Sequence, residues 1–191
     1  MEITYALPEN ITNPDLFTGR HEIMDNFLHW VKNIRKGLGK SRALLSRRKK
    51  GKTAIMQRLY NIVWSQNDTV VPFFYEISEK NQSLGYFAED FLKSFLSQYY
   101  SFTNRELRFV NKPLSLEELE DLFAQDKDIL DYLISFSKLK KENNPSGLWE
   151  FARVLPHAIA AQKNIKILQF IDEFQNINKY IIDKNDKPID T

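Results

Sequence analysis

Residues 42–65 read RALLSRRKKGKTAIMQRLYNIVWS, and this stretch decides the fold that the sequence predicts. It begins with a short apolar run at 43–45 and passes through a basic loop. It ends in a segment whose apolar residues recur at helical spacing. We therefore expect a buried strand at 42–45, a loop at 46–50 and a helix from Lys52 to about Ser65.

The basic loop matches a phosphate-binding pattern in part. The pattern G-x-x-x-x-G-K-[ST] is met at Gly51, Lys52 and Thr53, and Ser46 stands in place of the first glycine. In such a loop, backbone N–H groups surround the phosphates, the lysine reaches the β- and γ-phosphates, and the hydroxyl binds Mg²⁺. A Gly-Lys-Ser/Thr tripeptide alone arises in roughly one chain in ten of this length, so a solvated basic loop is an equal interpretation. The candidate phosphate-binding residues are Ser46, Arg47, Arg48, Lys49, Lys50, Gly51, Lys52, Thr53 and Ala54.

Two more apolar segments predict strands at 70–77 (VVPFFYEI) and 166–171 (KILQFI), because both are rich in β-branched or aromatic residues. Pro72 lacks an N–H group, which favours either an edge position for the strand at 70–77 or pairing that begins after Pro72. Helical apolar stripes separate the three strands. This order predicts an α/β fold in which helices flank a parallel sheet.

The strand expected at 166–171 runs directly into Asp172 and Glu173, as in a Walker B motif, although Gln169 interrupts its apolar run. An aspartate at such a strand end holds Mg²⁺. The adjacent glutamate faces the other way and can polarise an attacking water. Two acids at the end of a strand are also common in proteins where they neither bind a metal nor take part in catalysis. Because ligands bind at the carboxyl ends of parallel strands, we expect this pair and the basic loop at one edge of the sheet.

The 191 residues are expected to form one domain with a helical insertion. A lead-in covers 1–16, the half that carries the basic loop covers 17–80, and a helical elaboration between the second and third strands covers 83–162. The acidic strand and its loop cover 165–178, and a polar tail covers 183–191. Within the elaboration, Ser115 and Glu118 fit a helix-capping box.

The composition bounds the class of protein. Apolar residues make up 42% and charged residues 27%, and there is no cysteine, which excludes disulfides, thiolate metal sites and a thiol nucleophile. No apolar run approaches the ~20 residues of a membrane helix, and the N-terminus is unlike a signal peptide, so we expect a cytoplasmic protein without membrane contact. The net charge is only +2, but nine Lys or Arg and no acid lie between Arg35 and Lys52. One local anion-binding place is therefore favoured over a surface that coats nucleic acid.

Four segments then occur in a familiar order. FTGRHE at 17–22 opens a helix, and it is followed by RRKKGKTA at 47–54, VPFFYEI at 71–77 and FIDEFQNI at 170–177. In this combination the chain resembles the AAA+/STAND P-loop ATPases, and most closely their archaeal-ATPase-like branch, over residues 15–178. The resemblance implies Mg²⁺-dependent ATP hydrolysis that drives a conformational switch in a larger protein or complex.

The resemblance also implies roles for single residues. Phe17, Gly19 and Arg20 would lie near the nucleotide base. Lys52 would bind phosphate and act in catalysis. Thr53 and Asp172 would hold Mg²⁺, and Glu173 would activate the attacking water.

Two departures from the family bear on activity: Ser46 replaces a glycine, and 120 positions separate Lys52 from Asp172. The family sheet has the strand order 5-1-4-3-2, and only 18 residues follow Glu173, too few for the fourth and fifth strands. We therefore expect the N-terminal part of an ATPase domain, weak or inactive as this isolated chain. A missing C-terminal part or a protein partner is expected to complete the site.

Two other functions stay open. The basic segment 35–52 is compatible with a non-enzymatic nucleic-acid-binding module, although the aromatic residues lie at helical core spacing rather than among the basic residues. A degenerate P-loop scaffold without binding is the other alternative, and Ser46 is its main support.

Overall fold

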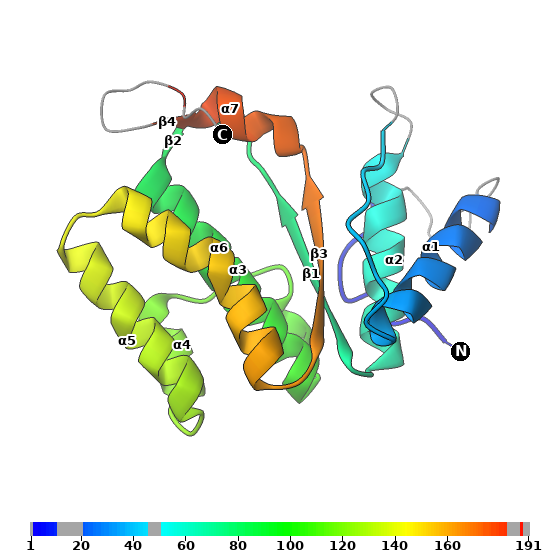
Figure 1. The fold of residues 1–191 in the computed structure, drawn as a ribbon, viewed down its shortest axis with the longest axis horizontal. Coiled ribbons are helices and arrows are strands. Elements are labelled where there is room, and N and C mark those ends of the chain that lie inside the picture. Colours follow the sequence, from blue (N-terminus) through cyan, green and yellow to red (C-terminus); the bar gives the residue numbers. More distant parts are fainter. Residues whose placement is uncertain (1, 11–20, 46–50, 183–187, 189–191) are drawn as a thin grey trace.

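The computed structural model describes residues 2–10, 21–45, 51–182 and 188. These residues form a mostly helical α/β protein with two small parallel sheets (Figure 1). The elements in chain order are α1 (His21–Arg35), α2 (Lys52–Gln66), β1 (Val70–Glu76), β2 (Gln82–Ser83), α3 (Leu84–Asn104), η2 (Leu107–Phe109), α4 (Leu116–Leu122), α5 (Lys127–Lys141), α6 (Pro145–Gln162), β3 (Lys166–Asp172), η3 (Phe174–Asn176), α7 (Ile177–Tyr180) and β4 (Ile181–Ile182).

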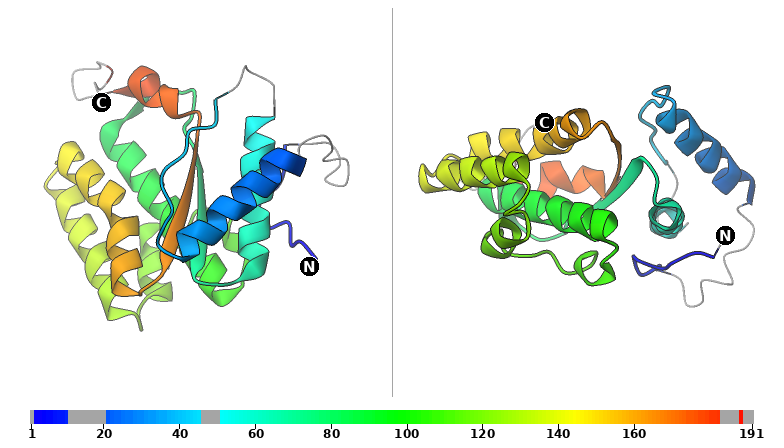
Figure 2. Two further views of the ribbon diagram at one scale, coloured as in Figure 1. Left: turned by 45° about the vertical axis from the view of Figure 1, so that its right-hand side comes forward. Right: turned by 90° about the horizontal axis from the view of Figure 1, so that it is seen from below.

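The larger sheet consists of β1 and β3, which run parallel in a register from Val70↔Lys166 to Glu76↔Asp172. Helices α1 and α2 lie on one side of it, and α3, α5 and α6 lie on the other; Figure 2 shows the same layers from two further directions. The smaller sheet pairs β2 with β4, also in parallel. The predicted α/β class, with parallel strands flanked by helices, is confirmed.

The prediction of a strand at 42–45 is wrong. No strand occurs in the described residues 36–45, and Leu45 is 88% exposed. The segment is held instead by Trp30, whose Nε1 donates a hydrogen bond to the Lys40 carbonyl oxygen at 2.8 Å and whose ring lies under the Arg42 guanidinium. A run of three apolar residues becomes a strand only beside a paired neighbour, and among the described residues β3 pairs with β1 alone. The larger sheet therefore has two strands, not the expected three.

The outer edge of β1 is closed to further pairing. Lys166 donates its N–H to the Thr69 oxygen and Ile77 donates to the Asp172 oxygen, so the odd-numbered residues of β1 face β3. Pro72 faces the outer edge, where its missing N–H costs nothing, and the predicted edge position is confirmed. Next to it, buried Gln98 of α3 accepts from Phe74 N at 2.9 Å and donates to Phe74 O at 2.8 Å.

The free edge of β3 differs. By the same alternation, the backbone groups of Ile167, Gln169 and Ile171 point away from β1. No strand in the described part of the chain pairs with them. The larger sheet can therefore grow on the β3 side only.

Replacing Gln98 by alanine should lower the free energy of unfolding by about 2 kcal/mol. The change removes both partners of the buried Phe74 backbone, and an unsatisfied buried polar group costs ~1–3 kcal/mol. Urea denaturation followed by circular dichroism measures the loss, and the exposed Gln125→Ala variant is the matched control. Equal stability of both variants would show that Gln98 does not close this edge.

The core is centred on β1 and the helices that separate it from β3 in the chain. The Phe73 ring makes edge contacts with Phe91 at 5.2 Å and Phe95 at 5.3 Å, both from α3. The predicted capping box begins α4, with Ser115 N donating to Glu118 and Glu118 N donating to Ser115. None of the helices in the described ranges is long and apolar enough to cross a membrane.

Candidate functional site

The first turn of α2 meets the end of β3. Thr53 Oγ1 donates a hydrogen bond of 2.6 Å to Asp172 Oδ2, across 119 positions of sequence. Asp172 is only 3% exposed, and its other oxygen accepts from the Glu173 N–H at 3.0 Å. Asp172 lies on the same face of β3 as Phe170, whose ring contacts Tyr60 of α2. The described part of the phosphate-loop motif, Gly51 to Thr53, and the acid pair therefore come together at the carboxyl end of β3.

Gly51 fixes how α2 begins. It precedes the helix in the left-handed conformation, with φ 72° and ψ 30°, which glycine adopts without steric cost. Gly51, the N-cap residue, has no side chain that could cap this helix start. The first N–H groups of a helix have no partner within the helix, and together they carry a partial positive charge. The start of α2 is thus suited to an anion.

Glu173 follows β3 in a less common backbone conformation, with φ 52°. Such a conformation costs a non-glycine residue roughly 1 kcal/mol or more, so its surroundings have to hold it. Gln175 donates a side-chain hydrogen bond to the Glu173 carboxylate. Asn176, which is buried, donates to the Ile77 carbonyl oxygen at 2.9 Å and ties this turn to the end of β1. Sequence reasoning missed Asn176, because its only signal is a polar residue beside apolar ones.

Several carboxylates lie at the carboxyl ends of β1 and β3. Glu76 stands opposite Asp172 in the register of the sheet. Partial burial, and then the charges of nearby carboxylates, raise the pKa of the Glu76 carboxyl above its ordinary value. These neighbours are Asp172, Glu173 and Glu79. A bound cation would relieve their mutual repulsion.

The residues present fit a magnesium ion that is shared with a ligand. In the described ranges, no three His, Cys, Asp or Glu side chains are grouped so that they could hold a metal by themselves. Mg²⁺ usually keeps several waters and takes one or two protein oxygens plus phosphate oxygens. Thr53 Oγ1 and Asp172 Oδ2 provide two such oxygens side by side.

The remaining predicted site residues divide into two groups. Lys52 is the first residue of α2, and Ala54 is buried one position beyond Thr53. The other predicted residues lie outside the described residues: Phe17, Gly19, Arg20, Ser46, Arg47, Arg48, Lys49 and Lys50.

Comparisons of the chain with protein-family models, with curated proteins and with solved structures found no match. The structure itself establishes an α/β protein with small parallel sheets packed against helices. Any assignment of function therefore depends on the geometry at the start of α2 and the end of β3.

Proposed function

We propose that the chain is a P-loop ATPase domain of the AAA+/STAND type, which binds Mg-ATP at the start of α2 and uses its hydrolysis to switch conformation. The observation that carries the proposal is the 2.6 Å contact between Thr53 Oγ1 and Asp172 Oδ2. It joins the hydroxyl of a Gly-Lys-Thr loop to the first acid of an Asp-Glu pair. The left-handed Gly51, which offers no side chain to cap the helix, supports the same assignment.

Each residue then has a role. Lys52 binds the β- and γ-phosphates, and Thr53 and Asp172 hold Mg²⁺. Mg²⁺, when bound, supplies charge neutralisation at the phosphates. Glu173 orients the attacking water and accepts its proton. Hydrolysis is an in-line displacement at the γ-phosphorus, in which positioning and charge provide most of the rate.

A protein partner or a further C-terminal part completes the site in this proposal. The outer edge of β1 is closed by Pro72 and Gln98, whereas the backbone of β3 faces an unpaired edge. A parallel strand from either source fits beside β3, the strand that carries Asp172. Without that strand we expect turnover well below the ~1–10³ s⁻¹ usual for enzymes.

Binding of nucleic acid through 35–52 is less well supported. Arg35 forms an ion pair with Asp68 at 2.6 Å, and Arg42 stacks on Trp30 at 5.5 Å. Both cations thus already take part in the packing of α1. The alternative predicts that the affinity for DNA falls steeply as salt rises. It also predicts that Mg-ATP does not compete with DNA for binding.

Thr53→Val tests the proposal, because valine keeps the shape of threonine and removes the hydroxyl. In calorimetric titrations, the wild-type chain should bind ATP more tightly with Mg²⁺ than with EDTA. The variant should lose roughly tenfold in Mg²⁺ and nothing in EDTA, because one ligand of the ion is gone. Circular dichroism establishes that both proteins are folded.

Thr103→Val, near the end of α3, is the matched control and should bind like the wild type. A folded wild-type chain that binds no ATP with or without Mg²⁺ would contradict the proposal. So would a Thr53→Val protein whose affinity falls equally in Mg²⁺ and in EDTA.

A further inference from the structure

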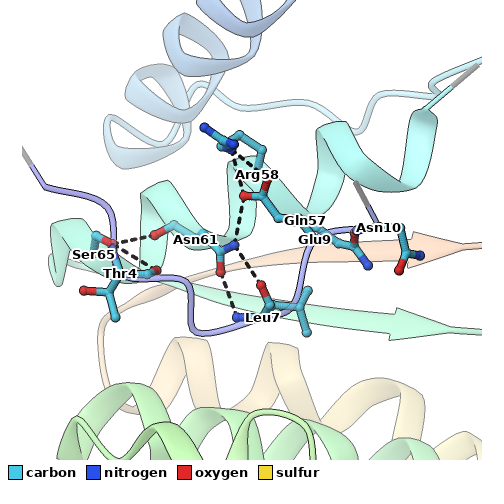
Figure 3. A network of polar contacts seen from close by, with 8 residues as sticks. All are labelled: Thr4, Leu7, Glu9, Asn10, Gln57, Arg58, Asn61 and Ser65. Carbon is cyan, nitrogen blue, oxygen red and sulfur yellow. Dashed lines mark hydrogen bonds and ion pairs between the residues drawn. The ribbon is translucent and has the colours of Figure 1, made fainter. Parts of the chain in front are cut away.

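Residues 2–10, here called the N-terminal strap, lie along α2 (Figure 3). Three backbone N–H groups of the strap donate to three side chains of the helix. Thr4 N bonds to Ser65 Oγ at 2.8 Å, Leu7 N to Asn61 Oδ1 at 2.8 Å, and Asn10 N to Gln57 Oε1 at 2.6 Å. The three acceptors are spaced by four residues and form one stripe of α2.

The centre of the strap is clamped most firmly. Asn61 is fully buried, and its Nδ2 also donates to the Leu7 carbonyl oxygen at 2.9 Å, so one amide side chain satisfies both backbone groups of Leu7. The Glu9 side chain is 0% exposed. Its carboxylate accepts from Arg58 Nε at 2.7 and 3.0 Å and from Asn61 Nδ2 at 3.1 Å. Helix α2 thus recognises the strap through two side chains, the buried amide of Asn61 and the guanidinium of Arg58.

The strap and the candidate site share one rigid element. Gln57, which binds the last residue of the strap, lies four residues after Thr53, which is one helical turn or ~6 Å along α2. Apolar anchoring of the strap is small, since only Ala6 and Leu7 are buried apolar residues. Segments held mainly by polar contacts open at a lower free energy than the core.

We propose that the N-terminal strap is a conformational device coupled to the ligand site at the start of α2. A docked strap holds the first turns of α2 in the position that brings Thr53 to Asp172, and an occupied site favours the docked strap. Coupling of this kind is reciprocal, so ligand protects the strap by the same factor by which strap release weakens the ligand. The identity of the ligand, Mg-ATP, rests on the proposed function; the coupling of the strap to the first turns of α2 does not.

Glu9→Lys tests the coupling from the strap itself. It places a cation against Arg58 and leaves every residue of α2 unchanged. Glu2→Lys makes the same charge change at an exposed position of the strap and is the matched control. Amide hydrogen exchange by NMR reports on Leu7 and Asn10, and on Ile55, whose N–H donates to the Gly51 oxygen at 3.1 Å. Calorimetry reports Mg-ATP affinity.

In the wild type, Mg-ATP should slow exchange at Leu7 and Asn10. Glu9→Lys should speed exchange at these amides and at Ile55, and it should weaken Mg-ATP binding roughly 5- to 20-fold. The control should change none of these. A Glu9→Lys protein with a released strap but wild-type exchange at Ile55 and wild-type affinity would overturn the coupling. If the folded wild type binds no Mg-ATP, the proposed function fails, and Ile55 exchange in Glu9→Lys still decides the coupling: faster exchange supports it and unchanged exchange overturns it.

Discussion

Lys52→Ala should weaken Mg-ATP binding by about 100-fold or more and leave the fold intact. The lysine is the first residue of α2, at the helix end that carries partial positive charge. Losing a charged partner of a phosphate costs ~1.5–3 kcal/mol in hydrogen bonding, and a 100-fold change corresponds to ~2.7 kcal/mol. Titration calorimetry measures the loss, and circular dichroism shows whether the variant is folded.

Arg47→Ala is the control that separates a phosphate site from a patch of charge. In a phosphate-binding loop the backbone and one lysine do the binding, so Arg47→Ala should change affinity by less than about threefold. Equal losses in both variants would mean that the loop acts through net charge alone. The P-loop assignment would then be wrong.

Phe73→Ala should have the largest effect on stability, about 3–5 kcal/mol. The side chain is 0% exposed, and its ring packs edge-on against Phe91 and Phe95. Truncation removes these contacts and leaves a cavity between β1 and α3, which the surrounding helices fill only in part. Urea denaturation gives the change in unfolding free energy.

Phe174→Ala is the matched control, because this phenylalanine is 62% exposed. Its stability should stay within about 0.5 kcal/mol of the wild type. A loss below ~1 kcal/mol for Phe73→Ala would show that α3 is not packed on β1 as described.

Periodicity was sufficient to predict the helices, and the β-branched and aromatic residues were sufficient to predict two of the strands. An amphipathic stripe follows the buried face of a helix, and α2 begins at Lys52, as the sequence predicts. The contact between Thr53 and Asp172 agrees with the expectation that the acid pair and the basic loop lie together, although that expectation relied on a strand at 42–45 that the structure does not contain.

Pairing and polar clamps could not be predicted in the same way. Whether 42–45 forms a strand depends on a neighbour, and three apolar residues carry no information about one. Gln98, Asn61 and Asn176 interrupt apolar patterns, and each binds backbone groups of a distant segment. In the sequence such residues are visible only as polar interruptions of an apolar pattern, because their partners are fixed by the tertiary structure.

The unequal edges of the larger sheet limit how copies of this protein can associate. Pro72 and Gln98 stop pairing at the outer edge of β1, so among the described residues the β3 edge is the one side of this sheet that can accept a strand. If two copies met through that edge, each would use its one available side, and no free edge would remain. For the described part of the chain, edge-to-edge growth through this sheet would end at two molecules, which would disfavour fibres formed by this route.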